Sequence, residues 1–322
     1  MLTKNEAISQ LNDLGAAGQP FSFYCDFLGE RWCVEESSSH FENRSFQLSI
    51  GDELRVASCE RPITFKKHPA NFLEFKKAFD QVIHHINIGN SFLTNLTFET
   101  PIETSLTLEE IYQYSNARYK LLAPDRFVVF SPETFVRMQD DHIYSYPMKG
   151  TIDATIPNAE KVILSDVKET AEHVTIVDLI RNDLSQVASD VEVTKFRYID
   201  TLETNDKKLL QVSSEIRGSL DPSWKENLGS ILSKLLPAGS ISGAPKPETV
   251  KIIQQTESYN RDFYTGICGH FDGQTLDTGV MIRFIKKEGD QLIFCSGGGI
   301  TSFSEAEKEY QEMVDKVYLA IN

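Results

Sequence analysis

Apolar residues recur every three or four positions along several stretches of the chain, which is the spacing of one helix face. The clearest case runs from Asn71 to Asn90, where phenylalanines lead the apolar face and Gly89 supplies a stop signal. The same spacing predicts helices over residues 1–15, 158–189, 224–235, 247–257 and 304–320.

Between these helices, apolar and polar residues alternate as they do in half-buried strands. Strands are predicted over residues 91–99, 126–131, 134–138, 142–148, 190–199 and 209–218, with a hairpin over 278–297 that turns at 288–290. The three runs from 126 to 148 predict an antiparallel meander that brings Lys149 to a strand end. Hairpin-type joins, with helices bunched between the strands, favour an α+β fold over an alternating doubly wound one.

Composition narrows the class of protein. At 322 residues the chain is long enough for one large domain or two, and 40% apolar residues allow a sizeable core. The net charge of −15 and the lack of a basic run argue against a nucleic-acid partner. Five scattered cysteines without a CxxC pair indicate free thiols in a reducing cytosol, and no run approaches a membrane span. We therefore expect a soluble cytoplasmic protein with neither a nucleic-acid nor a membrane partner.

Two predicted helices carry glutamates on one face. Glu169 and Glu172 lie three positions apart, and Glu309, Glu312 and Lys316 share a face of the last helix. Carboxylates from two helices can converge on a hard cation such as Mg²⁺, which prefers oxygen ligands. Two solvated faces of an acidic protein are the alternative, and the spacing alone does not decide between them.

Three other polar residues stand in unusual settings. Lys149 lies between Pro-Met and Gly-Thr, and Glu133 follows a serine-proline pair. Arg283 occurs in a predicted apolar strand, where it would share a face with Met281 and Ile285. An inward arginine there must meet an anion, because an unpaired buried guanidinium costs several kcal/mol. For the lysine and the arginine, a solvated side chain is the alternative.

These segments, in this order, resemble the chorismate-utilising enzymes, and within them the aminodeoxychorismate synthase component I family (also called para-aminobenzoate synthase component I). The matching blocks are "SPETF", "PMKGT", "ETAEHVTIVDLIRNDLS", "LPAGSISGAPKPETVKII", "YTGICGHFDG", "DTGVMIRF", "CSGGGIT" and "EKEYQEMVDK". They run from about Ser91 to the C-terminus. Residues 1–90 match only loosely and form a shorter N-terminal part than in long family members.

The resemblance implies a single chorismate-binding domain over residues 1–322, with 91–322 as its catalytic core. Its fold would be two large antiparallel sheets packed as a sandwich with helices outside, and chorismate and Mg²⁺ would bind in a cleft. The implied activity is that of a transferase, which aminates chorismate with ammonia to 4-amino-4-deoxychorismate, the step before para-aminobenzoate in folate synthesis. A separate glutamine amidotransferase would supply the ammonia.

The resemblance also assigns roles to individual residues. Lys149 would be the nucleophile that attacks chorismate at carbon 2, and Glu133 the general acid that protonates the departing hydroxyl at carbon 4. Glu172 and Glu312 would bind Mg²⁺, with Glu169 and Glu309 as partners through water. The substrate-binding residues would be Arg283, Tyr264, Gly297, Gly299, Lys316, Thr151, Ser240 and Gln211. Asp178, Arg181 and Asp183 of "DLIRND" are interpreted as structural.

This reading makes a physical demand on Lys149. An amine attacks only when it is neutral, and neutralising an ordinary lysine at pH 7 costs roughly 4–5 kcal/mol. Burial and a nearby Mg²⁺ lower that cost, so we expect Lys149 inside the cleft beside the metal. Glu133, in turn, needs a pKa raised by burial, because an ionised carboxylate cannot donate a proton.

Two positions depart from the family pattern. Leu93 stands where many relatives have glutamine and where water-adding relatives have a lysine base, which argues against isochorismate and salicylate synthases. Gln211 replaces a histidine and cannot titrate near neutral pH, so an acid–base role there is in doubt. Anthranilate synthase, which carries alanine in place of Lys149, remains an alternative, as does a non-catalytic paralogue.

Overall fold

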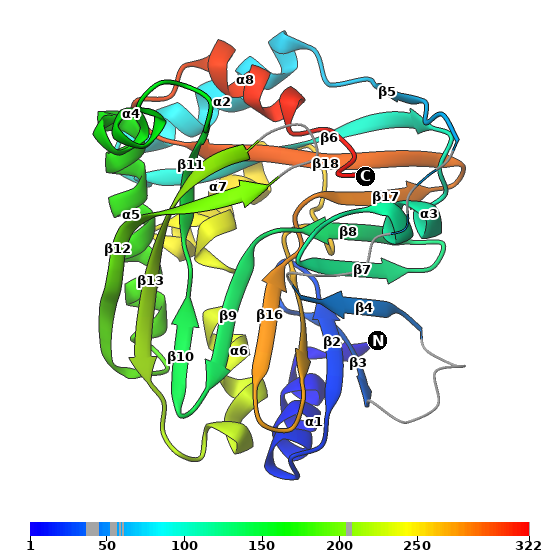
Figure 1. Cartoon of the computed structure of the whole chain (residues 1–322), viewed down its shortest axis with the longest axis vertical. Coiled ribbons are helices and arrows are strands. Elements are labelled where there is room, and N and C mark those ends of the chain that lie inside the picture. The colour runs from blue at the N-terminus through cyan, green and yellow to red at the C-terminus, as the bar shows by residue number, and fades with distance from the viewer. Residues whose placement is uncertain (37–44, 52–56, 58, 60, 204–207, 322) are drawn as a thin grey trace.

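The computed structural model describes residues 1–36, 45–51, 57, 59, 61–203 and 208–321, whose strands form two large antiparallel sheets (Figure 1). The first sheet contains, in spatial order, β1 (Leu2–Thr3), β3 (Arg31–Glu36), β2 (Phe21–Cys25), β15 (Ile267–Phe271), β16 (Leu276–Val280), β9 (Thr134–Gln139), β10 (His142–Ser145), β13 (Lys208–Ser219) and β11 (Met148–Asp153), and β12 (Ser189–Glu203) also pairs with β13. The second contains β14 (Gly243–Ala244), β6 (Leu93–Thr104), β18 (Gln291–Ile300), β17 (Phe284–Glu288), β8 (Phe127–Ser131), β7 (Tyr119–Ala123) and β4 (Gln47–Ile50), and β5 (Phe65–Lys67) pairs with β6.

The helices lie on the outside of this two-sheet arrangement (Figure 1). They are α1 (Lys4–Ala16), α2 (Phe72–Asn87), α3 (Leu108–Tyr114), α4 (Ala159–Ser165), α5 (Val167–Leu184), α6 (Leu228–Leu235), α7 (Lys246–Thr256) and α8 (Ala306–Asp315), with 3-10 turns η2 (Trp224–Asn227) and η3 (Gly239–Ile241). None of the described helices is long and apolar enough to cross a membrane. The predicted α+β sandwich with outer helices is confirmed.

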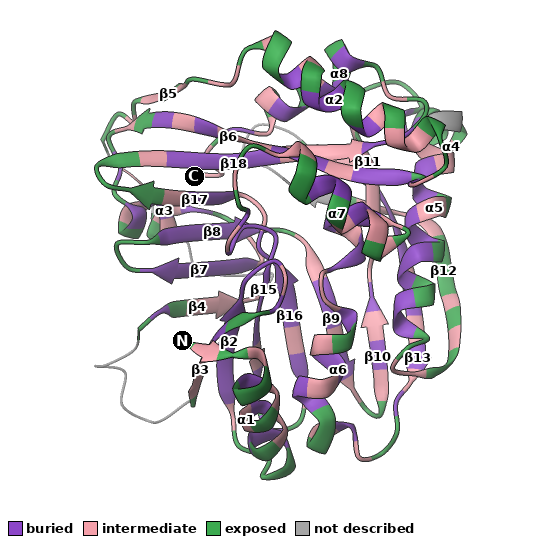
Figure 2. Ribbon diagram, turned by 180° about the vertical axis from the view of Figure 1, so that it is seen from behind, coloured by how far each residue is buried: buried purple, intermediate pink, exposed green. Residues whose placement is uncertain are grey.

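Local sequence explains where the helices start and which face they bury. Asn71 caps α2 by accepting a hydrogen bond from the Glu74 backbone amide at 3.0 Å, and Phe75, Phe79 and Val82 form its buried face. The strands β2, β7 and β8 are buried along their whole length, as Figure 2 shows by their colour. Sheet interiors and inward helix faces therefore build the core together.

Most sequence-predicted elements are confirmed, but the meander over residues 126–148 is wrong. Its first run is β8 in the second sheet, whereas the next two runs are the hairpin β9–β10 in the first sheet. Pro132 lies between them and cannot donate a ladder hydrogen bond, so the chain leaves one sheet there. The helical region after Asn158 also divides, because Asp166 ends α4 and caps α5 by accepting from the Glu169 amide at 2.9 Å. Lys149 is the second residue of β11.

The predicted hairpin over 278–297 is likewise divided between the sheets. Its first part belongs to β16 in the first sheet, and its second part forms β17 and β18 in the other. Arg283 therefore does not sit within an alternating strand, because it lies between β16 and β17 with a left-handed backbone at φ 50°. The last helix is shorter than predicted and ends at Asp315, with Lys316 as its C-cap.

The two crossings between the sheets meet each other. One passes through Glu133, between β8 and β9, and the other through Arg283, between β16 and β17. The amide of Val280 donates to the Glu133 carbonyl at 3.0 Å, and the amide of Phe130 donates to the Arg283 carbonyl at 3.1 Å. Each crossing thus brings a charged side chain to the boundary between the layers.

Candidate active site

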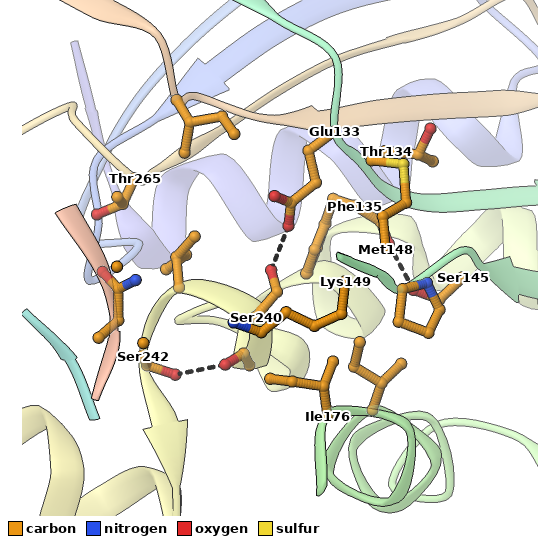
Figure 3. Close-up of a pocket in the computed structure, with 18 of the residues that line it drawn as sticks. Glu133, Thr134, Phe135, Ser145, Met148, Lys149, Ile176, Ser240, Ser242 and Thr265 are labelled. Atoms are coloured by element: carbon orange, nitrogen blue, oxygen red, sulfur yellow. Dashed lines mark hydrogen bonds between the residues drawn. The ribbon is translucent and has the colours of Figure 1, made fainter. Parts of the chain in front are cut away.

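A cavity of about 210 Å³ opens where the two sheets and α5 meet. Its wall has an apolar part, formed by residues such as Phe135 and Ile176, and a polar part (Figure 3). The polar part contains Glu133, Lys149, Ser240, Tyr264, Arg283, Lys316 and the glycines Gly297, Gly298 and Gly299. Eight of the sequence-predicted site residues are therefore brought to one cavity.

The strand β11 presents Lys149 through an irregular start. Its pairing with β13 shifts register between Met148 and Thr151, as in a β-bulge, which re-aims a side chain. Gly150 has φ 81°, a conformation that glycine adopts without cost, and a Cβ there would lie 3.0 Å from Glu169 Oε2. Gly150 therefore allows the local turn of the backbone that points Lys149 toward the cavity.

Lys149 forms an ion pair with Glu172, with 2.6 Å between Nζ and Oε2. Burial lowers the pKa of Lys149, but the Glu172 carboxylate more than offsets this, and the net direction is above the ordinary 10.5. Lys149 is therefore charged in this arrangement. The neutral amine expected from the sequence requires that this ion pair be broken or the carboxylates be neutralised.

Glu172 is held in place by its own helix. It is 4% exposed and lies on the face of α5 that also carries Ile176 and Ile180 into the cavity wall. The neighbouring His173 contacts Ser214 of β13 through Nε2 at 2.7 Å, and burial lowers the pKa of this histidine to about 4. A neutral, buried imidazole thus fixes α5 against the first sheet.

The glycines of β18 allow α8 and β11 to approach the same spot. A Cβ at Gly298 would lie 3.5 Å from both Glu312 Oε1 and Lys316 Nζ, and 3.8 Å from Glu309 Oε2. A Cβ at the adjacent Gly299 would lie 3.8 Å from Lys149 Nζ. The charges of Glu312 from α8 and of Glu169 from α5 both act on Lys149, so these carboxylates lie close enough to the Lys149–Glu172 pair to interact with it.

The four predicted metal-binding glutamates supply the right kind of donor for Mg²⁺. Mg²⁺ takes one or two carboxylates and completes its shell with water and substrate oxygens. Glu172 forms an ion pair with Lys149, and Glu312 forms one with Lys316 at 2.6 Å. In this structure each of these two carboxylates is therefore neutralised by a lysine ammonium group. Among the described residues, no three acidic, histidine or cysteine side chains are already clustered as a metal site. The chemistry of these carboxylate donors is compatible with Mg²⁺.

Glu133 accepts a hydrogen bond from the Ser240 hydroxyl, with 2.5 Å between Oγ and Oε1 (Figure 3). Burial raises the pKa of Glu133 above its ordinary 4.5, and this outweighs the hydrogen bond from Ser240 and the nearby charges of Lys316, Arg283 and Lys149. The direction matches the expectation for a group that must hold a proton before it can donate one.

Arg283 and Tyr264 form the end of the cavity near the second sheet. Arg283 stacks its guanidinium 5.1 Å from the Tyr318 ring centre, and its buried Nε has no hydrogen-bond partner among the described residues. Burial raises the pKa of Tyr264, which keeps its hydroxyl protonated. A guanidinium with an unused donor, next to a neutral hydroxyl, is suited to a carboxylate ligand.

Two predicted substrate-binding residues do not line this cavity. Thr151 and Gln211 face each other across the β11–β13 ladder, and Thr151 is exposed. The register shift after Met148 explains why, since it turns Lys149 inward while the regular strand beyond it runs along the sheet edge. A role for either residue in binding the substrate is therefore not supported.

Sequence reasoning missed Asn95 and Thr265, which also line the cavity. Thr265 has φ 61°, which is unusual for a β-branched residue, and its hydroxyl donates to the Tyr264 carbonyl at 2.6 Å. Both residues lie within segments that the sequence did single out, Asn95 in "FLTNL" and Thr265 in "YTGICGHFDG". Leu93, flagged as a departure, lies at the cavity as well, within 3.0 Å of a Cβ at Gly299.

The fold and this site define a chorismate-binding enzyme. Residues 28–322 match the family model described as chorismate binding enzyme, and the chain belongs to that family. A Haemophilus influenzae protein named "uncharacterized PabA-like protein" is 48% identical over 99% of this chain and 98% of its own length.

More distant relatives carry the names of specific enzymes. An aminodeoxychorismate synthase component 1 of Salmonella typhimurium is 30% identical over 76% of this chain and 56% of its own length. An anthranilate synthase component 1 of Arthrobacter globiformis is 34% identical over 58% of this chain and 35% of its own. The chain thus spans about half the length of the aminodeoxychorismate synthase component and about a third of the length of the anthranilate synthase component.

Two solved structures have the same fold as this chain. Anthranilate synthase component I from Streptococcus pneumoniae superposes with a TM-score of 0.66 at 27% identity, covering 81% of this chain and 60% of that one. The menaquinone-specific isochorismate synthase MenF from Escherichia coli gives a TM-score of 0.64 at 19% identity over 82% and 63%. The second likeness concerns the fold alone.

Proposed function

We propose that this protein is the ammonia-using component of an aminodeoxychorismate synthase, which converts chorismate and ammonia into 4-amino-4-deoxychorismate and water. The observation that carries the proposal is the position of Lys149, whose amine lies in the cavity beside Glu172 and the β18 glycines. The 30% identity to a named aminodeoxychorismate synthase component supports it. A separate glutamine amidotransferase would supply the ammonia, and the step would precede para-aminobenzoate in folate synthesis.

Chorismate carries two carboxylates, and the cavity offers cations at two places. Arg283, with its unused Nε donor, and the neutral hydroxyl of Tyr264 would take the enolpyruvyl carboxylate. Lys316, which donates to the Gly297 carbonyl at 2.9 Å, would face the ring carboxylate. Mg²⁺ held by Glu172 and Glu312, with Glu169 and Glu309 acting through water, would supply further positive charge there.

The proposed chemistry uses two side chains. The lone pair of Lys149 Nζ forms a bond to ring carbon 2, the two ring double bonds shift, and the carbon–oxygen bond at carbon 4 breaks. Glu133 gives its proton to the departing oxygen, which leaves as water. Ammonia then forms a bond to carbon 4, the double bonds return, and the bond to Lys149 breaks. Leu93 beside this amine carries no base that would activate water instead.

A product assay tests the proposal. The purified protein is incubated with chorismate, Mg²⁺ and ammonium salt at pH 8, and the products are separated by mass spectrometry. We expect aminodeoxychorismate from the wild type and from Lys161→Ala, which changes an exposed lysine of α4, and none from Lys149→Ala. Aminodeoxychorismate from Lys149→Ala at the wild-type rate would overturn the role of the lysine.

Anthranilate synthase is the second candidate, because a relative of that name is 34% identical over 58% of this chain. The same assay decides between the two, since anthranilate has lost the enolpyruvyl group and differs in mass from aminodeoxychorismate. Anthranilate as the main product, unaffected by Lys149→Ala, would favour this second function.

A further inference from the structure

Ser240 occupies a special place in the cavity wall. It lies on the 3-10 turn η3, and its hydroxyl donates to Oε1 of Glu133 across 2.5 Å, as the dashed line in Figure 3 shows. Oε1 is therefore occupied as an acceptor. The second carboxyl oxygen of Glu133, Oε2, has no such bond from Ser240.

The turn that carries Ser240 is fixed from behind by α5. A Cβ at Gly239 would lie 2.8 Å from Asp183 Oδ2 and 3.2 Å from the Leu179 side chain, so only glycine allows this close approach. Asp183 is in turn held by Lys246, with 2.7 Å between the charged atoms, and Lys246 also donates to the Leu235 carbonyl at 2.9 Å. Asp183, the second aspartate of "DLIRND", thus supports the turn. Ser240 therefore has little freedom to move away from Glu133.

We propose that Ser240 is the positioning residue of the general acid: by donating to Oε1 of Glu133, it places the acidic proton on Oε2. A carboxylic acid carries one proton, and an oxygen that already accepts a hydrogen bond from a hydroxyl is the less favourable place for it. Proton transfer then runs from Oε2 to the leaving hydroxyl of the substrate. This inference rests on the proposed function and replaces direct substrate binding as the role of Ser240.

Besides the hydrogen bond from Ser240, three positive charges act on Glu133. They are Lys149 from β11, Arg283 from the second crossing and Lys316 from the end of α8, and each favours the ionised carboxylate. The carboxylates of a bound substrate would offset Arg283 and Lys316. The bond from Ser240 remains in both states, so it is the feature that fixes the orientation of the acid throughout the reaction.

Two variants separate positioning from substrate binding and from mere structure. Ser240→Ala removes the donor, and Ser240→Thr retains it as the matched control. We expect kcat of Ser240→Ala to fall by about 10- to 100-fold, a large part of what a general acid contributes, with KM unchanged. We expect Ser240→Thr to stay near the wild type. A rise in KM with kcat unchanged would overturn the proposal in favour of direct substrate binding.

A titration without turnover provides the second readout. In protein labelled with ¹³C at the glutamate carboxyl carbon, the Glu133 signal is identified by its loss in Glu133→Gln. Because the Ser240 hydroxyl stabilises the carboxylate, we expect the titration midpoint of Glu133 to move to higher pH in Ser240→Ala and not in Ser240→Thr. An unmoved midpoint in Ser240→Ala would refute the inference. This titration decides the question even if the wild type makes no aminodeoxychorismate, a result that would count against the proposed function alone.

Discussion

The buried pair of Arg261 and Glu257 offers a sharp test of what holds the cavity together. Both side chains are 1% exposed, and the guanidinium binds both carboxylate oxygens, at 2.9 Å from Nε and 2.6 Å from Nη2. The same guanidinium donates at 2.8 Å to the backbone carbonyls of Ile241 and Asn95, two residues of the cavity wall. One arginine therefore ties the turn η3 to β6.

Replacement of Arg261 by methionine keeps apolar volume but leaves Glu257 buried without its cation. Breaking a buried ion pair by removing one partner costs about 3–5 kcal/mol, which is about a fifth or more of a stability of about 5–15 kcal/mol. We expect this loss in the free energy of unfolding, measured by urea denaturation. Substrate affinity should fall as well, because two wall carbonyls lose their donor.

Two control variants show whether the loss in Arg261→Met comes from the unpaired buried charge. Arg181→Met removes an exposed arginine that pairs with Asp178 one turn away on α5, and we expect it to cost at most about 1 kcal/mol. In the double variant Arg261→Met/Glu257→Gln no charge is left unpaired, while the oxygen of the new amide can still accept from the Thr97 backbone amide, as the Glu257 carboxylate does at 2.9 Å. The double variant should therefore be more stable than Arg261→Met alone. A loss in Arg261→Met no larger than in Arg181→Met would refute the reasoning.

Further predictions concern the site itself. Gly150→Ala forces alanine to φ 81°, costs about 1–2 kcal/mol in unfolding, and should lower kcat more than it raises KM, since it disturbs the bulge that points Lys149 inward. Thr265→Gly removes a strained β-branched residue at φ 61°, and we expect a melting temperature that does not fall, together with a higher KM as Tyr264 is held less firmly. Glu172→Gln and Glu312→Gln should abolish Mg²⁺-dependent activity while circular dichroism stays unchanged, and near-normal turnover in both would remove the metal assignment. Because burial holds the pKa of Glu133 above 4.5, the wild type should lose stability relative to Glu133→Gln as the pH rises from 4.5 through the folded-state pKa, and urea midpoints at pH 4 and pH 8 would show whether that difference opens.

The sequence was a good guide to element type and a poor guide to which sheet each strand joins. The helix at α2 and the strands β6 and β13 follow from local spacing, because one face of each carries buried residues. Spacing carries no information on a crossing between sheets, since apolar residues on both sides of the crossing are buried anyway. The strand predicted through Arg283 is the clearest example, and Pro132 was the one local signal that a strand had to end.

The sequence likewise predicted some residues of the candidate site correctly and missed the position of others. Motif order led to Lys149, Glu133 and Arg283, and the structure places all three at one cavity. Thr151 lies only two positions from Lys149 but belongs to the regular part of β11. The close packing of Gly239 against Asp183 is also invisible in the sequence, because α5 and η3 are more than fifty residues apart along the chain.

The paired crossings at Glu133 and Arg283 couple the chemistry of the protein to the alignment of its layers. The carbonyl of each crossing residue accepts a hydrogen bond from the strand that leads into the other crossing, so the proposed proton donor and the proposed anion-binding arginine are linked through the backbone. If one sheet slides over the other, both groups shift in register with it, whereas Lys149 stays with the far edge of its own sheet. A small slip between the layers would therefore separate Lys149 from Glu133, the proposed nucleophile and acid, while every strand remained intact, and turnover would fall before any loss of secondary structure.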